Sequence, residues 1–211
     1  MNKLLTIALP KGRLGDQAIQ ALEEIGWTNA IDKQSRKLVF VDESLRLRFL
    51  FVKPVDVITY VQNGVADLGI IGKDSILEEE ADVYELLDLG FGQCRFAIAG
   101  KRKSLLHQTD SILRIATKYP KVTQSYFQKR NQAIEIIRLN GSVELAPLVG
   151  LSDVIVDIVE TGGTLKANGL EILEDMMDIS AKLIANRVSY RFKQDRIKQL
   201  TEALQRQKES V

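Results

Sequence analysis

Short apolar runs alternate along the chain with segments whose apolar residues recur at helical spacing. Residues 4–9, 68–71 and 154–159 are nearly continuous in apolar residues, which is typical of buried strands covered on both faces of a sheet. Residues 19–25 and 197–204 instead carry apolar side chains three or four positions apart, which predicts amphipathic helices. This alternation of strand and helix predicts an α/β fold.

The number of strand–helix units is too large for one compact sheet in a chain of 211 residues. We therefore expect two lobes, each with its own sheet, and an active site in the cleft between them. The break is expected near Gly90–Gly92, with residues 1–90 and 176–211 in lobe I and residues 91–175 in lobe II.

Two further elements are predicted from local signals. The alternating pattern of residues 45–52 predicts one strand, followed by Pro54 at the start of a helix. Ser189 precedes the last amphipathic segment and is of a residue type that caps helix N-termini, so the final helix is expected to begin there.

Composition narrows the classes of function. Lysine and arginine total 29 against 28 acidic residues, and a net charge of +1 argues against a general nucleic-acid binder. A single cysteine, Cys94, excludes an internal disulfide framework, and a single histidine, His107, excludes a histidine-rich metal site. No apolar run approaches the roughly 20 residues of a membrane span, and no targeting segment is recognised, so a cytoplasmic protein without membrane contact is expected.

The most informative segment is an apolar strand that runs into a loop of residues 160–164, here called the glycine loop. Gly162 and Gly163 allow a ligand to approach the backbone closely, and Thr161 and Thr164 add hydroxyl donors. Backbone N–H groups at the start of a following helix, expected near Leu165, favour a bound phosphate. The alternative is a tight turn that leads into a threonine-capped helix.

Asp157 lies near the end of the strand that precedes the glycine loop. It stands between Val156 and Ile158 in an apolar run, where a carboxylate is uncommon unless it has a specific role. A carboxylate at this place can accept hydrogen bonds from ribose hydroxyls while the 5′-phosphate lies in the glycine loop. The sequence therefore points to a sugar phosphate as ligand.

Other nucleotide-binding motifs are incomplete. A P-loop needs glycine at position 67 and serine or threonine at position 74, but both positions hold aspartate. The pair Gly90 and Gly92 lacks the third glycine of a dinucleotide fingerprint, because position 95 is arginine.

Cationic side chains follow two of the expected strands. Lys11 and Arg13, on either side of Gly12, come directly after the first strand, where open α/β sheets bind their ligands. They are suited to hold a pyrophosphate or triphosphate, and Arg36 and Lys53 are weaker candidates of the same kind. The alternative for each is an ordinary solvated surface cation.

Six short motifs together carry a resemblance to a known family. They are Leu-Pro-Lys-Gly-Arg at 9–13, Gly-Lys-Asp at 72–74, Ile-Ala-Thr-Lys-Tyr at 115–119, Glu-Leu-Ala-Pro at 144–147, Asp-Ile-Val-Glu-Thr-Gly-Gly-Thr-Leu at 157–165 and Ala-Asn-Gly-Leu at 167–170. In this order and spacing the set resembles the ATP phosphoribosyltransferase family across nearly the whole chain.

The resemblance implies a two-lobed fold like that of type II periplasmic binding proteins. It implies the first step of histidine biosynthesis, in which ATP and 5-phosphoribosyl 1-pyrophosphate give N1-(5-phosphoribosyl)-ATP and pyrophosphate, with Mg²⁺. The length is similar to the short form of the family. That form implies a homo-oligomer, expected to be a dimer, which assembles with a regulatory subunit similar to histidyl-tRNA synthetase.

The resemblance also implies roles for individual positions. Catalytic cations are expected at Lys11, Arg13 and Arg36. Phosphoribosyl pyrophosphate is expected to contact Asp157, Glu160, Thr161, Gly162, Gly163, Thr164 and Leu165. ATP or substrate contacts are expected at Gly72, Asp74, Cys94, Lys118 and Glu144. Lys53 stands where many short-form relatives carry arginine, so a bidentate contact is expected to be lost there.

Two other functions remain open on the sequence. A solute-binding protein of the same fold would bind a metabolite without chemistry, although the glycine loop argues against it. A purine-salvage phosphoribosyltransferase has a similar loop but usually two adjacent carboxylates, whereas Asp157 is followed by Ile158.

Overall fold

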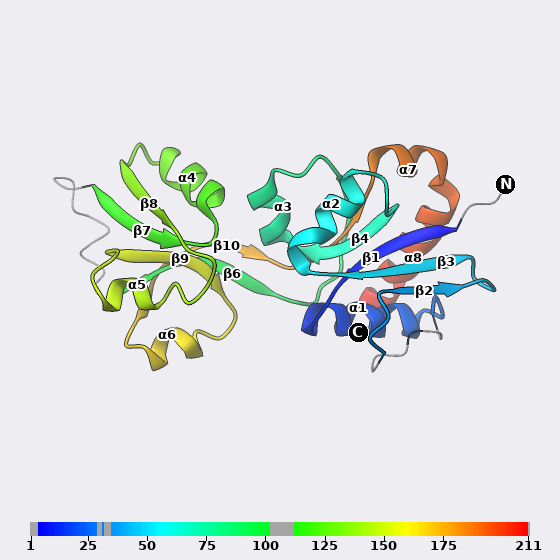
Figure 1. Cartoon of the computed structure of the whole chain (residues 1–211), viewed down its shortest axis with the longest axis horizontal. Helices are drawn as coiled ribbons and strands as arrows, with labels where there is room; N and C mark the ends of the chain where they lie inside the picture. Colours follow the sequence, from blue (N-terminus) through cyan, green and yellow to red (C-terminus); the bar gives the residue numbers. More distant parts are fainter. Residues whose placement is uncertain (1–3, 29–30, 32–34, 102–111, 211) are drawn as a thin grey trace. The chain divides into compact units, whose positions relative to one another are not determined.

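The computed structural model describes residues 4–28, 31, 35–101 and 112–210, and His107 lies outside these ranges (Figure 1). The described residues divide between two compact units. The first comprises those within 1–76, 80–92 and 180–211, and the second comprises those within 77–79 and 93–179. The lobes expected from the sequence differ from these units by the short segment 77–79 and by a few residues at each boundary.

A six-stranded mixed sheet forms the centre of the first unit, with strand order β2-β3-β1-β4-β11-β5. Strand β1 is parallel to both of its neighbours, β3 and β4, whereas β11 is antiparallel to β4 and β5. The strands are β1 (Leu5–Pro10), β2 (Val39–Asp42), β3 (Leu47–Val52), β4 (Leu68–Gly72), β5 (Tyr84–Asp88) and β11 (Ala181–Ala185).

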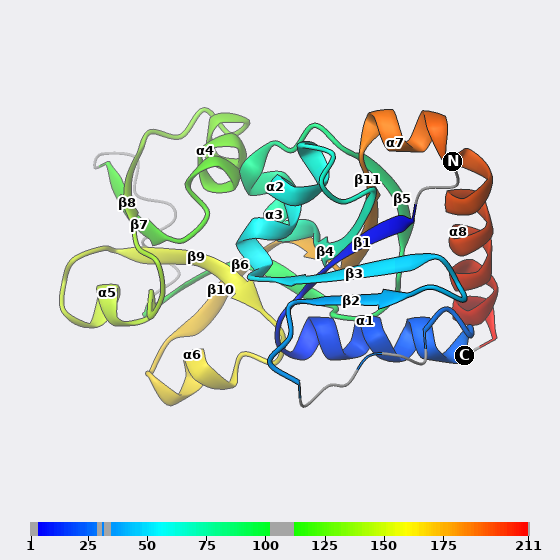
Figure 2. The same ribbon diagram turned by 45° about the vertical axis from the view of Figure 1, so that its right-hand side comes forward.

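Helices cover both faces of this sheet, as Figure 2 shows for α1 and α2. Alternate side chains of β1 explain the arrangement, because Ile7 and Leu9 pack with the apolar faces of α1 and α8, whereas Ala8 packs with α2. The helices are α1 (Arg13–Glu24), η1 (Pro54–Asp56), α2 (Val57–Gln62), α3 (Lys73–Glu79), α7 (Arg187–Phe192) and α8 (Gln194–Glu209); the last three residues of α3, 77–79, are counted in the second unit.

The second unit contains a five-stranded sheet with strand order β10-β6-β9-β7-β8. Its central strand β9 is parallel to β7 and antiparallel to β6, so the continuous apolar run is buried on both faces within a mixed sheet. Helix α4 covers one face, and α5 and α6 lie on the other (Figure 1). The elements are β6 (Cys94–Gly100), β7 (Leu113–Thr117), α4 (Pro120–Gln128), β8 (Ile134–Arg138), α5 (Leu145–Leu148), β9 (Val154–Val159), α6 (Gly163–Ala167) and β10 (Glu171–Ile179).

Two local predictions were wrong. The strand expected over 45–52 begins only at Leu47. Arg46 has a φ of 52° and belongs to the turn that connects β2 to this strand, β3. Ser189 does not begin the last helix but lies inside α7, whose first turn is capped by the side chain of Asn186. The Ser189 hydroxyl instead donates to Asp67, 2.7 Å away.

None of the helices in the described part of the chain is both long enough and apolar enough to cross a membrane.

Candidate active site

A cavity of about 250 Å³ in the second unit, here called the Gly162 cavity, brings together the residues expected to bind a sugar phosphate. It is lined by Glu144 and by the continuous segment from Asp157 to Leu165. All seven positions assigned to phosphoribosyl pyrophosphate therefore line one cavity, together with a carboxylate that the sequence analysis assigned to ATP or substrate.

The glycine loop is held between two buried anchors. Strand β9 ends at Val159, and Leu165 of α6 is buried in the same apolar cluster. Gly162 bridges them with a φ of 76°, a left-handed conformation that residues with a Cβ adopt only at a cost. The helix begins at Gly163, two residues earlier than expected, which places more of the loop in the first helical turn.

The first turn of α6 leaves backbone donors available. The N–H of Lys166 bonds to the Gly162 carbonyl at 3.0 Å, and the N–H of Gly163 lies 3.4 Å from the Thr161 hydroxyl. The N–H groups of Thr164 and Leu165 have no hydrogen-bond acceptor among the described residues. Both residues line the Gly162 cavity, so an anion bound there can accept from these two groups.

Asp157 lies where β9 approaches the loop. Its residue is only half-buried, and Oδ1 accepts the N–H of Ile158 at 2.9 Å. Because side chains alternate along a strand, Asp157 shares its face of the sheet with Ile155 and Val159. Both of these pack in the cluster beside α5 and α6, so the carboxylate lies on the cavity side of the sheet.

Glu144 comes to the same cavity from another element. It occupies the residue before α5 but makes no capping hydrogen bond with its side chain. Its carboxylate has no hydrogen-bond or ion-pair partner within the described part of the chain. The half-buried Glu144 carboxylate does not cap the helix, so it can accept hydrogen bonds from a ligand.

The first unit contains a separate cavity of about 470 Å³, here called the Lys11 cavity, which brings Lys11 and Arg36 together. Its remaining lining residues are Pro10, Gly12, Gly15, Asp16, Ile19, Ile31, Ser35, Lys37, Phe40 and Phe51. The Phe40 and Phe51 rings meet edge to face with centroids 5.5 Å apart. Arg13 does not line this cavity; it is the exposed first residue of α1.

Close packing positions Lys11 at the end of β1. A Cβ on Gly15 of α1 would lie 1.8 Å from the Pro10 carbonyl oxygen, so only glycine allows the helix to approach the strand this closely. The N–H of Lys11 continues the sheet by donating to the Val52 carbonyl at 2.9 Å.

The other expected contact residues lie on several elements. Gly72 ends β4, and a Cβ there would lie 2.1 Å from Oδ1 of Asp74, so glycine makes room for this carboxylate. Cys94 begins β6 and is half-buried against the core of the second unit. Lys118 is exposed beyond β7, with Nζ 5.6 Å from the centroid of the Tyr119 ring, and Lys53 precedes η1.

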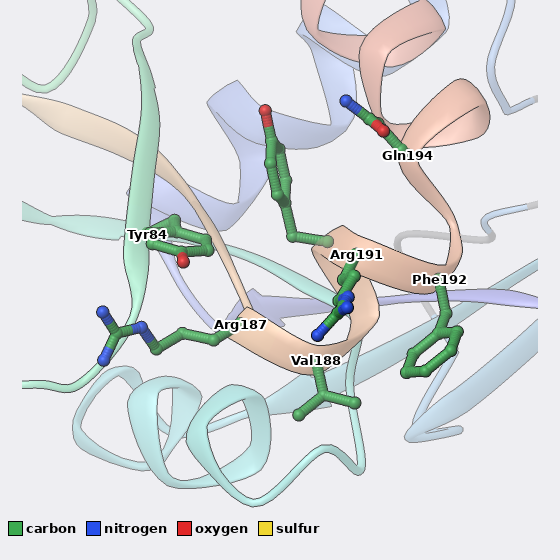
Figure 3. A pocket seen from close by; sticks show the side chains of 7 residues that line it. Tyr84, Arg187, Val188, Arg191, Phe192 and Gln194 are labelled. Atoms are coloured by element: carbon green, nitrogen blue, oxygen red, sulfur yellow. The ribbon is translucent and has the colours of Figure 1, made fainter.

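A third cavity, on the first unit, contains none of the expected site residues. It also measures about 470 Å³ and is lined by Tyr84, Arg187, Val188, Tyr190, Arg191, Phe192 and Gln194 (Figure 3). Val188 and Phe192 stand one helical turn apart on α7 and are 63% and 79% exposed. The spacing of these two residues is visible in the sequence, but their exposure is seen only in the structure.

Comparison with known proteins decides the family. A family model described as ATP phosphoribosyltransferase (HisG) matches residues 53–206. The chain belongs to the ATP phosphoribosyltransferase family. It is 58% identical to the ATP phosphoribosyltransferase of Clostridioides difficile over 93% of this chain and 94% of the relative. It is 56% identical to that of Oceanobacillus iheyensis over 88% of this chain and 89% of the relative.

Solved structures agree. The ATP phosphoribosyl transferase (HisG:HisZ) complex from Thermotoga maritima contains a chain that is 37% identical, with a TM-score of 0.82 over 99% of this chain and 100% of that one. The VFT2 domain of BvgS from Bordetella pertussis matches with a TM-score of 0.59 and 14% identity, a likeness of fold alone. The expected α/β fold of the type II periplasmic-binding-protein kind is confirmed.

Membership of the ATP phosphoribosyltransferase family confirms the main interpretation of the sequence. The chain is a pentosyltransferase of histidine biosynthesis, and neither the solute-binding protein nor the purine-salvage enzyme is favoured. Enzymes of this class need a divalent metal.

The described residues do not fit a metal centre built by the protein alone. They include no group of three or more His, Cys, Asp or Glu side chains placed to hold an ion. Phosphate-bound Mg²⁺ needs only one or two carboxylates, because substrate oxygens and water supply the other ligands.

Proposed function

We propose that the chain transfers the phosphoribosyl group of 5-phosphoribosyl 1-pyrophosphate to N1 of ATP, and that the Gly162 cavity binds the sugar phosphate. The observation that carries the site assignment is the lining of that cavity. It combines the two unpaired N–H groups of Thr164 and Leu165, two threonine hydroxyls and three carboxylates, which come from strand β9, from the glycine loop and from the residue before α5.

The second unit binds the phosphoribosyl group from both ends. The 5′-phosphate accepts hydrogen bonds from the N–H groups of Thr164 and Leu165 and from the hydroxyl of Thr161. Asp157 accepts from the ribose hydroxyls, and Glu144, which also lines the cavity, supplies a further acceptor. Donors thus meet the phosphate and acceptors meet the hydroxyls, which fixes the direction in which the sugar binds.

The reaction is a substitution at C1′ of the ribose. Adenine N1 forms a bond to C1′ while the bond from C1′ to the pyrophosphate oxygen breaks, and its electron pair leaves with pyrophosphate. Positive charge builds on the ribose and negative charge on the leaving group. Alignment of the reactants and electrostatic stabilisation therefore contribute more than a strong base.

Cations of the first unit neutralise the phosphates. Lys11 and Arg36, which share the Lys11 cavity, and Arg13 at the start of α1 act on pyrophosphate and on the ATP phosphates. Gly72, Asp74, Cys94 and Lys118 contact ATP or the assembled substrates. Lys53 offers a single ammonium where arginine would offer a bidentate contact.

Mg²⁺ is the proposed divalent metal, bound mainly by pyrophosphate oxygens, where it neutralises negative charge. We further propose that the enzyme works in the cytoplasm as a dimer and assembles with a separate regulatory subunit. The Thermotoga maritima structure, a HisG:HisZ complex, supports such an assembly.

The direct test mixes the purified chain with ATP, phosphoribosyl pyrophosphate and Mg²⁺, with and without a regulatory subunit. We expect the absorbance of an N1-substituted adenine to appear together with one equivalent of pyrophosphate. Adenine and hypoxanthine are the control acceptors, and neither should react. Transfer to a free base but not to ATP, or binding without release of pyrophosphate, would contradict the proposal.

A further inference from the structure

Thr117 is a completely buried polar residue at the end of β7, with 0% of its surface exposed. Its hydroxyl donates to the carbonyl oxygen of Val156 at 2.7 Å and accepts the N–H of Tyr119 at 2.9 Å. A buried hydroxyl with two such partners is costly to remove, because each partner then loses a hydrogen bond in a dry environment.

The Val156 carbonyl belongs to the peptide bond that leads into Asp157. In the sheet, β9 pairs with β7 only as far as Val156, whose partner is Thr117 itself. Beyond this point Asp157, Ile158 and Val159 pair on the β6 side alone. The hydroxyl of Thr117 is therefore the last recorded attachment of β9 to β7 before the carboxylate and the glycine loop.

We infer that Thr117 is a positioning residue for the ribose-binding carboxylate: its hydroxyl fixes the Val156–Asp157 peptide and so aims Asp157 at the sugar. The inference rests on the proposed function, since it assumes that Asp157 contacts the ribose hydroxyls. Thr117 does not line the Gly162 cavity. Its effect passes through the backbone of one peptide.

Thr117→Val keeps the shape of the side chain but removes the hydroxyl, whereas Thr117→Ser keeps the hydroxyl and removes only the methyl group. Calorimetry with ribose 5-phosphate and with inorganic phosphate as separate probes distinguishes the carboxylate from the glycine loop. For Thr117→Val we expect roughly ten-fold weaker binding of ribose 5-phosphate, with phosphate affinity changed less than about two-fold. Thr117→Ser should bind ribose 5-phosphate within about two-fold of the wild type.

Thr123→Val is the matched control. Thr123 is also 0% exposed; its hydroxyl donates to the Tyr119 carbonyl at 2.7 Å and lies 3.5 Å from the Thr117 hydroxyl, but among the described residues it has no hydrogen bond to β9. It should lower stability without separating the two probes. The double variant Thr117→Val/Asp157→Asn should bind ribose 5-phosphate no more weakly than Asp157→Asn alone, because the two changes remove the same interaction between Asp157 and the sugar.

Two results would overturn the inference and are distinguishable. In the first, Asp157→Asn weakens the binding of ribose 5-phosphate, but Thr117→Val either leaves that binding unchanged or weakens the binding of both probes equally. Thr117 then does not act through Asp157. If Asp157→Asn itself leaves ribose 5-phosphate binding unchanged, the proposed sugar site fails and the inference fails with it. Should Thr117→Val not fold, Thr117→Cys replaces it, because a thiol is similar in size to the hydroxyl but is a weaker donor. The same two affinities are then measured, and the same loss of ribose 5-phosphate binding is expected.

Discussion

Glu144 and Asp157 line the same cavity, although one precedes helix α5 and the other lies within strand β9. These two carboxylates and the unpaired N–H groups of Thr164 and Leu165 give the Gly162 cavity both hydrogen-bond acceptors and donors. Each can bind one part of a sugar phosphate, and the predictions below separate their contributions.

Removing either charge should weaken binding of the sugar more than it slows turnover. Hydrogen bonds to a charged group contribute about 1.5–3 kcal/mol, so Asp157→Asn or Glu144→Gln should raise KM for phosphoribosyl pyrophosphate roughly ten- to a hundred-fold. Steady-state kinetics check this, with Glu171→Gln on an exposed position of β10 as control. A KM that changes equally in the control would show that general charge, not the cavity, is responsible.

The left-handed conformation of Gly162 can be tested against an equivalent glycine. Gly162→Ala and Gly169→Ala place a Cβ on residues with φ of 76° and 67°, so each should cost about 1–2 kcal/mol of stability. Only Gly162 lies in the cavity. We therefore expect similar losses in urea unfolding, but at least ten-fold weaker binding of phosphoribosyl pyrophosphate for Gly162→Ala alone. Equal affinities of the two variants would remove the loop from the binding site.

The two ends of the substrate should respond differently in kinetics. Arg13→Ala removes a cation proposed to stabilise the leaving pyrophosphate, so kcat should fall roughly ten- to a hundred-fold or more. Thr161→Ala removes a hydroxyl proposed to bind the 5′-phosphate, so it should mainly raise KM for phosphoribosyl pyrophosphate. Near-normal kinetics for both variants would remove these assignments.

Acid should weaken the first unit through Asp88. Burial raises the pKa of this carboxyl, but hydrogen bonds from Lys182, the Gly90 N–H and Ser180 outweigh it and lower the pKa to about 2. A folded-state pKa below the unfolded value of about 3.9 gives stability that is present above pH 4 and lost as pH falls toward 2.

Asp88→Asn tests this dependence. The Asp88 side chain is 44% exposed, so solvent screening should limit the contribution to about 1 kcal/mol or less. Urea unfolding should show the wild type more stable than Asp88→Asn at pH 5, with the difference vanishing near pH 2. Lys182→Gln, which removes the cation that bonds to Asp88, should also lose most of this stability at pH 5. A gap that widens as the solution is acidified would contradict the account.

The glycine loop could be predicted because all its parts are adjacent in the sequence. An apolar strand, a carboxylate and two glycines within residues 157–165 define both the conformation and the chemistry locally. The place of Glu144 could not be predicted in this way. Its meeting with Asp157 depends on how α5 packs against β9, which no local pattern specifies.

The wrong predictions have tertiary causes. Ser189 and Asn186 are both good capping residues, and the choice between them depends on Asp67, a distant residue that binds the Ser189 hydroxyl. Strand β2 was not predicted, although residues 38–41 form a short apolar run; Val39 and Val41 on it are 50% and 43% exposed, which the sequence does not show. The pairing of Lys11 with Arg36 in one cavity likewise depends on the packing of α1 against the sheet.

The most direct test is a crystal structure of the chain with phosphoribosyl pyrophosphate. The account predicts the 5′-phosphate at the N–H groups of Thr164 and Leu165, with the ribose hydroxyls on Asp157. A sugar bound at another place, with the Gly162 cavity empty, would contradict it.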